Sequence, residues 1–195
     1  GDLLENKTWN PTFTMRGCTI EDHRARNIII KTPKKIVIEN NKLSSMMSSI
    51  LFRGESFYWY ESGNVEDVLI QNNHFKYCAY SGAEHAVLYV TPRLAKTFDE
   101  TVFFDRNIQF INNTIETFDN RIIIADRVDG LIIKGNTIIH TPTSEALYPD
   151  APMFELINCT NVEICKNKYE GKNTNSIKVD EVSKKNLKVK RNKGF

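Results

Sequence analysis

One motif recurs along the whole chain: an aliphatic run that ends in a fixed polar residue, usually asparagine. Seven copies end at Cys18, Asn41, Asn73, Asn113, Asn136, Asn167 and Asn192. By these positions, successive copies lie 23, 32, 40, 23, 31 and 25 residues apart. Self-similarity at such a period is typical of solenoids, in which each repeat adds one layer. The shortest repeats leave no room for a helix, so each layer must be built from strands and turns.

The spacing therefore predicts an all-β fold: a right-handed, single-stranded parallel β-helix of pectate-lyase-like type, with about seven coils in one domain spanning residues 1–195. Alternate residues of each strand should point into a common core. The last Asn of each motif is expected at the bend between strands, in left-handed backbone. Its amide should bond to the coils above and below, which makes the asparagine column a structural ladder.

Composition excludes several classes of function. The chain has 26 basic and 24 acidic residues, and without a basic stripe no nucleic-acid partner is expected. No apolar segment is long enough for a membrane span. The four cysteines lack zinc-site spacing, so neither a metal nor a cofactor is expected. A β-helix of this composition predicts a secreted or periplasmic protein, although the chain shows no signal peptide and begins at Gly1 like mid-domain sequence.

Function is expected where the repeat is interrupted, because solenoid insertions form loops that often line the binding face. We define the first insertion as residues 53–63 and the second as residues 91–100. Both follow an apolar strand at the same point of the coil, so they should stack on one side. The first insertion carries Arg53, Glu55 and Glu61 around four successive aromatic residues, 57–60. Aromatic faces beside carboxylates and arginine suit sugar recognition, although the loop could equally shield the solenoid flank.

Two further groups are candidates. The segment 21–27 contains Asp22, Arg24 and Arg26, which could orient a polar substrate or form an ion-pair network within the turn. Glu84 and His85 precede a strand and are expected beside the first insertion. A column of polar residues after the strands is also expected along one face, either as ligand contacts or as solvated side chains: Lys31, Arg53, Thr91, Asp126, Asn158 and Asp180.

Several short elements together resemble glycoside hydrolase family 110. They are Leu-Glu-Asn-Lys-Thr-Trp-Asn-Pro (4–11), Arg-Ala-Arg (24–26), Lys-Thr-Pro (31–33), Ser-Met-Met (45–47) and Trp-Tyr-Glu-Ser-Gly (59–63). The resemblance extends over most of residues 4–167. It implies a β-helical exo-α-galactosidase that removes terminal α-1,3-linked galactose with inversion and without a metal. It also implies that an upstream part of the helix contributes acidic residues, so that this chain is a C-terminal section.

Roles follow from the resemblance and the interrupted coil together. Glu61 is the first candidate for the catalytic carboxylate and Glu55 the second. Trp59 would stack on the sugar, with Tyr60 beside it. The expected substrate contacts are Asp22, Arg24, Arg26, Arg53, Glu84 and His85. The chain departs from the family pattern at Glu55, where Asp is expected, and before Arg24, where the pattern is less charged.

Alternatives from other classes are a non-catalytic sugar-binding β-helix and a structural or adhesive solenoid. A polysaccharide lyase is a weaker alternative, because no cluster of aspartates suggests its calcium site. The expected partner is a glycan with terminal α-galactose. Self-association through an open coil end is also expected, because unpaired strand edges favour pairing with another chain; a mass that rises with concentration would show it.

Overall fold

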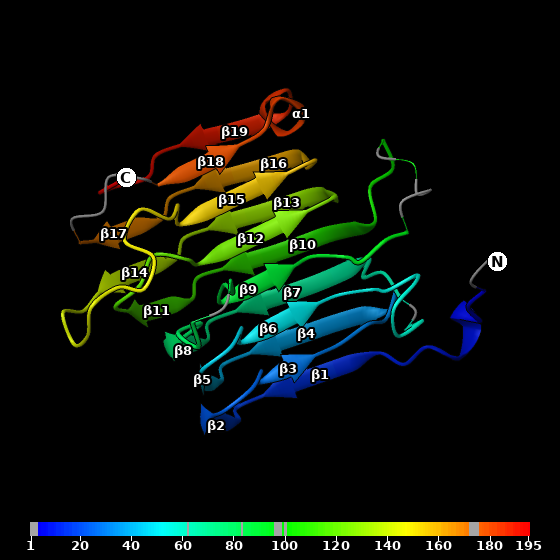
Figure 1. Cartoon of the computed structure of the whole chain (residues 1–195), viewed down its shortest axis with the longest axis horizontal. Coiled ribbons are helices and arrows are strands. Elements are labelled where there is room, and N and C mark those ends of the chain that lie inside the picture. Colours follow the sequence, from blue (N-terminus) through cyan, green and yellow to red (C-terminus); the bar gives the residue numbers. More distant parts are fainter. Residues whose placement is uncertain (1–3, 62, 83, 96–98, 100, 172–175) are drawn as a thin grey trace.

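The chain winds into a right-handed parallel β-helix whose coils stack along one axis, as the sequence predicts (Figure 1). The computed structural model describes residues 4–61, 63–82, 84–95, 99, 101–171 and 176–195. Ser62 of the Trp-Tyr-Glu-Ser-Gly element and part of the second insertion (96–98 and 100) therefore lie outside the described residues. Each of the first six coils contributes one strand to each of three sheets, which we call A, B and C in chain order, and the last coil adds a seventh strand to sheet A.

All three sheets keep the order of the coils. Sheet A consists of β1 (Phe13–Arg16), β4 (Lys35–Glu39), β7 (Asp67–Gln71), β10 (Asp105–Ile111), β13 (Val128–Lys134), β16 (Thr160–Cys165) and β19 (Leu187–Lys190). Sheet B consists of β2 (Thr19–His23), β5 (Lys42–Ser45), β8 (His74–Cys78), β11 (Thr114–Thr117), β14 (Thr137–His140) and β17 (Lys168–Glu170). Sheet C consists of β3 (Ile28–Ile29), β6 (Ile50–Phe52), β9 (Leu88–Val90), β12 (Ile123–Asp126), β15 (Phe154–Ile157) and β18 (Ile177–Val179).

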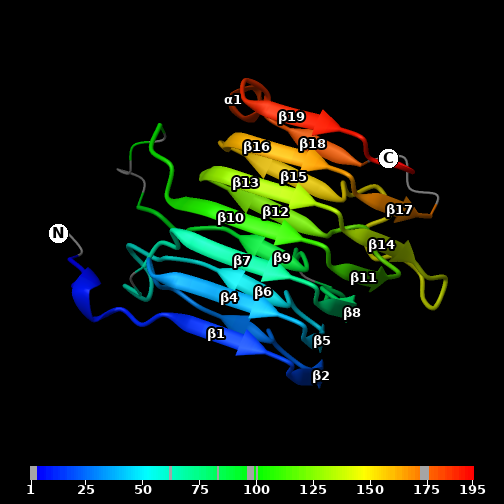
Figure 2. The same cartoon turned by 180° about the vertical axis from the view of Figure 1, so that it is seen from behind.

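Sheets A and C form opposite broad faces of the solenoid. Figure 1 views the molecule from the side of sheet C, and Figure 2 shows sheet A from behind. A short 3-10 helix, η1 (Lys7–Trp9), precedes the first coil. A single helical turn, α1 (Glu181–Lys184), leads into the last strand; the Asp180 side chain accepts a hydrogen bond from Ser183 N at its start. No helix in the described part is long and apolar enough to cross a membrane.

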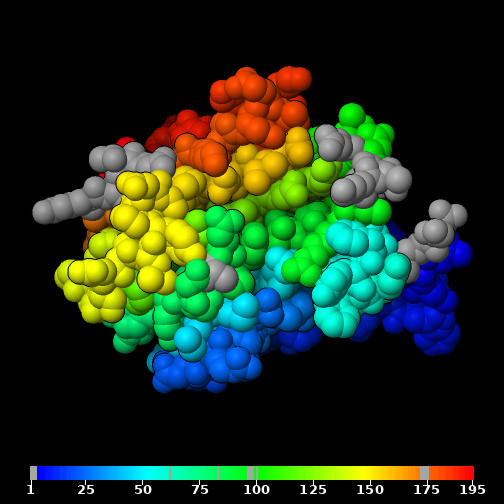
Figure 3. Space-filling view, in the orientation of Figure 1, coloured from blue at the N-terminus to red at the C-terminus, as the bar shows by residue number. Residues whose placement is uncertain are grey.

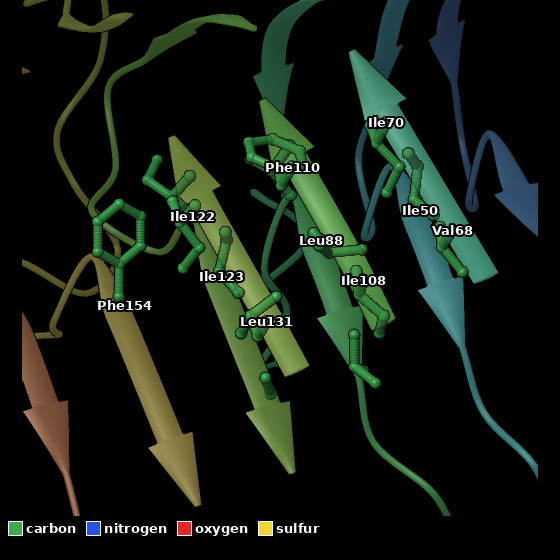
Figure 4. Packing of buried hydrophobic residues seen from close by; sticks show 14 of the residues in the cluster. Ile50, Val68, Ile70, Leu88, Ile108, Phe110, Ile122, Ile123, Leu131 and Phe154 are labelled. Atoms are coloured by element: carbon green, nitrogen blue, oxygen red, sulfur yellow. The ribbon is translucent and has the colours of Figure 1, made fainter. Parts of the chain in front are cut away.

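The core is a continuous column of apolar side chains that runs through the coils (Figure 4). Period-2 alternation explains it: in β7, Val68 and Ile70 are buried while Leu69 between them faces outward. Large side chains also stack from coil to coil, as Phe75 does on Phe110 with ring centroids 5.6 Å apart. All four cysteines are free, and three of them are buried.

The predicted asparagine ladder is present between sheets A and B. Each side-chain amide donates to the Oδ1 of the next asparagine: Asn41 to Asn73 (2.9 Å), Asn73 to Asn113 (3.1 Å), Asn113 to Asn136 (3.1 Å), Asn136 to Asn167 (2.9 Å) and Asn167 to Asn192 (3.0 Å). Each Oδ1 also accepts the backbone N–H of the preceding ladder residue, as Asn41 Oδ1 accepts from Cys18 N at 2.9 Å. Buried amides are thus satisfied without water.

Two details of the sequence prediction are wrong. The left-handed residue of each bend is the one before the ladder asparagine, such as Asn40 (φ 57°) and Asn112 (φ 53°), because the ladder residue itself must turn its amide inward. In the column after the sheet C strands, Ile157 rather than Asn158 stands opposite Asp126. The register of β15 is fixed by Phe154 and Leu156, whose side chains point into the core. The position opposite Asp126 therefore falls to Ile157, although it is apolar.

Candidate functional site on the outer face of sheet C

Outward-facing residues of sheet C provide an apolar floor. Parallel register places Ile29 beside Leu51, Leu51 beside Tyr89, and Tyr89 beside Ile124. Leu51 is buried although it points away from the core, so other side chains cover it. This is unusual for the outer face of a solenoid and indicates that something is built on top of the sheet at this level.

The covering structure is the first insertion, which is hydrogen-bonded to the second. Glu55 N donates to Glu61 O (2.8 Å), which closes the first insertion on itself. Arg93 N donates to Gly54 O (2.8 Å), and Ser56 N donates to Arg93 O (2.9 Å), so residues 54–56 and 93 pair as in a short parallel ladder. The prediction that the two insertions leave their strands together and stack is confirmed for residues 91–95.

Two glycines make this loop possible. A Cβ on Gly54 would lie 2.5 Å from the Phe104 ring, so only glycine fits where the loop leaves β6. Gly63 has φ +114°, and a Cβ there would lie 3.2 Å from Lys31 Cβ. The close approach of the loop's end to Lys31 brings the neighbouring Glu61 within ion-pair distance of the Lys31 ammonium group.

Between the first insertion and the sheet lies an open pocket of about 230 Å³. Its apolar surface comes from Ile29, Leu51 and Trp59, its cations are Arg26, Lys31, Arg53 and Arg93, and its carboxylates are Glu55 and Glu61. In the space-filling view, the first insertion (cyan) and the loop at residues 141–152 (yellow), which we call the excursion, stand on opposite sides of this face (Figure 3). The structure thus brings together five predicted residues: Arg26, Arg53, Glu55, Trp59 and Glu61.

The two carboxylates have different surroundings. The Glu55 side chain is 4% exposed; it ion-pairs with Arg93 (3.3 Å) and accepts a hydrogen bond from Trp59 N (3.3 Å). The Glu61 side chain is 57% exposed and is paired with Lys31 alone among the described residues. Glu55 therefore holds the loop and the Trp59 backbone in place, whereas Glu61 is open to a ligand.

The positive charge of the pocket is not fully balanced. Four cations face two carboxylates, and burial followed by the nearby Arg93 lowers the pKa of the Arg53 guanidinium. Arg53 lies over the Tyr89 ring at 5.4 Å, and its Nε donates to Thr91 O (3.3 Å). Arg53 is thus fixed against the floor of the pocket.

The other predicted residues lie elsewhere. Tyr60 is exposed and does not line the pocket, and the same holds for Arg24. Asp22 lines a separate depression at the end of sheet B, together with Glu21, Ser44, Lys76, Tyr77 and Tyr80. Glu84 is not beside the first insertion as predicted: it precedes β9, whereas the insertions follow their strands. It pairs instead with Arg121 at 3.3 Å.

His85 is buried at this same starting edge of sheet C. Its Nδ1 lies 3.3 Å from Ser48 Oγ. Burial, followed by the charges of Arg26, Arg53 and Arg121, lowers the pKa of its imidazole. The charges of the pocket residues Arg26 and Arg53 therefore act on His85, although His85 does not line the pocket.

Four pocket residues are absent from the predicted site: the charged residues Lys31 and Arg93, and the apolar floor residues Ile29 and Leu51. Lys31 belonged to the predicted polar column after the strands, at the position one coil before Arg53. Arg93 belonged to the second insertion, which was expected to stack on the first. The polar column and the expected stacking of the two insertions, taken together, therefore point to Lys31 and Arg93. Among the described residues, no group of three or more His, Cys, Asp or Glu side chains is placed to hold a metal ion.

Comparison with known proteins identifies relatives over nearly the whole chain. It is 35% identical to alpha-1,3-galactosidase B of Bacteroides thetaiotaomicron over 199 aligned residues, which cover all of this chain and 32% of that protein. It is 37% identical to alpha-1,3-galactosidase A of Bacteroides fragilis over 191 residues, 96% of this chain and 31% of that protein. A relative of the same name from Shewanella woodyi is 33% identical over 72% of this chain.

No family model matches the chain. The chain spans about a third of the length of the relatives it matches most fully. The similarity supports the resemblance that the short sequence elements suggest. The chain is therefore homologous to one portion of the alpha-1,3-galactosidases, proteins of the glycoside hydrolase family 110 type.

Proposed function

We propose that this chain forms part of a galactosidase site, in which the pocket on sheet C binds the terminal α-1,3-linked galactose of a glycan. One observation carries the proposal: an exposed carboxylate, Glu61, stands in a pocket with an aromatic wall and several cations. The names of the relatives supply the sugar and the linkage.

The dimensions and the chemistry of the pocket suit one sugar unit. A volume of about 230 Å³ is below the roughly 300–1,000 Å³ of pockets for drug-sized ligands. The Trp59 indole offers a stacking surface for the C–H face of a sugar ring, and Arg26, Arg53 and Lys31 offer hydrogen-bond donors for its hydroxyls. A terminal, exo-acting mode of recognition is consistent with a pocket of this size.

Glu61 is the group that we propose acts on the glycosidic bond. In an inverting reaction, one carboxylic acid protonates the leaving oxygen while a second carboxylate activates water, with the two about 6.5–9.5 Å apart. Glu55 lines the same pocket and is ion-paired with Arg93 at 3.3 Å, so it is the residue that we propose as the second carboxylate. We propose inversion without a metal, in which case chelation with EDTA leaves turnover unchanged.

A second candidate function is sugar binding without catalysis. It is favoured by the engagement of Glu55 with both Arg93 and the Trp59 backbone, which leaves Glu61 as the more accessible carboxylate. A binding site can use a single accessible carboxylate, whereas this class of hydrolysis needs two. The two functions predict different effects of removing the Glu61 charge. Hydrolysis predicts that turnover is abolished, whereas sugar binding without catalysis predicts only a change in affinity.

The test is hydrolysis of the disaccharide galactosyl-α-1,3-galactose, followed by proton NMR. We expect released galactose to appear first as the β-anomer, and Glu61→Gln to reduce the rate at least 100-fold, as for loss of a general acid or base. Glu163→Gln is the matched control, because Glu163 also pairs with a lysine, Lys190 (3.0 Å), but on sheet A. Binding of the disaccharide without turnover would favour the second candidate, and absence of both would refute the proposal.

A further inference from the structure

Three buried nitrogen atoms near the pocket have no hydrogen-bond partner among the described residues. They are Arg26 Nε, His85 Nε2 and Arg121 Nη1. Buried polar atoms are normally satisfied, so each such exception calls for a physical explanation. All three lie at the starting edge of sheet C, where Arg26 precedes β3, His85 precedes β9 and Arg121 precedes β12.

These residues form a connected group with Arg53, which we call the basic cluster: Arg26, Arg53, His85 and Arg121. Arg26, Arg53 and Arg121 all act electrostatically on His85, so each of the three lies near its imidazole. The Tyr89 ring lies among them, with Arg53 at 5.4 Å and the His85 ring in an edge-on contact at 6.2 Å. Arg121 is fixed by the Tyr148 ring, 3.7 Å away, from the excursion at 141–152.

The basic cluster has more positive charge and more buried donors than nearby acceptors can balance. Like charges brought together away from water destabilise one another unless an anion lies between them. Glu84 reaches one nitrogen of Arg121, Nη2, but it is strongly exposed and leaves Nη1 unpartnered. If the Ser48 hydroxyl donates to His85 Nδ1, the proton of the neutral ring lies on Nε2. His85 Nε2 is then a third buried donor without an acceptor, beside Arg26 Nε and Arg121 Nη1.

We propose that the basic cluster binds the anionic substituent, a carboxylate or a sulfate ester, of an acidic glycan whose sugar ring occupies the adjoining pocket. The inference rests on the proposed function for the sugar part only. Arg26 and Arg53 line the pocket as well as belonging to the cluster, so the cluster adjoins the pocket at these two residues. Guanidinium groups match the geometry of such oxyanions with paired N–H donors.

The test measures binding by isothermal titration calorimetry at low ionic strength, on the whole chain. The probes are galactose, galacturonate, galactose 6-sulfate and inorganic sulfate. We expect at least one acidic sugar to bind about tenfold more tightly than either galactose or inorganic sulfate, and added sodium chloride to weaken its binding while galactose binding is unaffected. If neither acidic sugar exceeds galactose, the proposal is overturned.

Other outcomes separate the sources of the anion and the two proposals. If inorganic sulfate binds as tightly as both acidic sugars, the cluster takes a free anion and the glycan assignment is overturned. Tight binding of an acidic sugar with no turnover of the galactosyl disaccharide would contradict hydrolysis and still support the cluster. Arg121→Gln is expected to weaken the acidic sugar about tenfold, whereas Lys134→Gln, which removes one charge from the outer face of sheet A, should leave every probe unchanged.

Discussion

The residues of the first insertion separate into those that build the loop and those that face a ligand. Gly54 and Gly63 belong to the first group, because each closely approaches a residue outside the loop, Phe104 or Lys31. Glu55 belongs to both groups: its contacts with Arg93 and Trp59 N hold the loop, and its carboxylate lines the pocket. Trp59 and Glu61 belong to the second, since both are largely exposed and line the pocket. A change in the first group should alter affinity and stability together, whereas a change in the second should alter ligand binding alone.

Asp105 anchors the chain where it returns from the first insertion to sheet A. Its Oδ1 accepts a hydrogen bond from Val65 N at 2.9 Å, and its Oδ2 has no partner among the described residues. Burial raises the pKa of the carboxyl group to about 7, against the effect of the Val65 hydrogen bond and with a further rise from Asp126. Near pH 7, Asp105 therefore exchanges a proton inside the fold.

The sign of the pH dependence follows from this raised pKa. Between the ordinary value of 3.8 and about 7, the folded chain holds the Asp105 proton more tightly than the unfolded chain. The contribution of Asp105 to the free energy of unfolding therefore falls as the pH rises through that window, by up to about 4 kcal/mol at 1.36 kcal/mol per pH unit. Asp105→Asn mimics the protonated form, so it should flatten the profile and stabilise the protein at pH 8.

Chemical denaturation of the parent and the variant between pH 4 and pH 8 measures the effect. Asp67→Asn is the matched control, because Asp67 is an exposed aspartate at the start of β7 in the same sheet. Parallel profiles for the parent and Asp105→Asn would show that Asp105 ionises normally in the folded chain.

At this scale, much of the pocket can be predicted from the sequence, and the residues that cannot be predicted share a physical reason. Glu61, Trp59 and Arg53 were visible because one loop carries them all. Lys31 and Arg93 come from other coils, and only the register between coils places them opposite that loop. Asp22 and Arg26 are close in sequence, yet the corner between sheets B and C directs them to different depressions.

At the scale of elements, the strands of sheet A follow from the sequence. Alternating aliphatic residues define the sheet A strands, and the asparagine that follows marks the bend into sheet B. The backbone conformation at the bend was harder to assign, because two adjacent asparagines such as Asn40 and Asn41 are both suited to it by type. The hydrogen-bond demand of the ladder decides between them, and that demand involves coils that are distant in sequence.

The ladder makes a graded stability prediction. Asn113 takes part in four side-chain hydrogen bonds, with Asn73 N, Asn73 Nδ2, Asn136 Oδ1 and Ile70 O, and it is buried. Asn113→Ala removes all four and leaves buried groups unpaired, so it should lower the free energy of unfolding by about 3–5 kcal/mol. Asn192 ends the described ladder with three such bonds and partial exposure.

We therefore expect Asn192→Ala to cost only about 1–2 kcal/mol. Urea denaturation of both variants measures the difference. Equal losses at the two positions would mean that the ladder does not act as a buried, connected network, and that each asparagine contributes only through its own bend.

At the scale of the whole molecule, the solenoid supplies a rigid face and the interruptions supply chemistry. The outer surface of sheet C lies between the first insertion on one side and the excursion at 141–152 on the other (Figure 3). The loops that border the face come from different coils: the first insertion follows β6, the second follows β9, and the excursion follows β14. The solenoid and the first insertion can be predicted from the sequence. The unpaired donors of the basic cluster cannot, because they come from different coils and only the fold shows that they lack partners.

The proposed ligand of this face comes from the names of the relatives. Their names specify an α-1,3-galactosidase, and the matched portion is about a third of their length. The proposed function therefore requires that this portion itself presents a galactose site. The pocket contains one of the two tryptophans of the chain, Trp59, while the other, Trp9, lies in η1 outside the pocket and is also exposed.

The two indoles allow a direct measurement with an internal control. In nitrogen-15-labelled protein, titration with methyl α-galactoside should shift the indole N–H resonance of Trp59 in a saturable manner and leave that of Trp9 unchanged. Glucose at the same concentrations should produce a much smaller shift at Trp59. An unshifted Trp59 resonance at saturating galactoside, or equal shifts at both indoles, would contradict the assignment of the sheet C pocket as a galactose site.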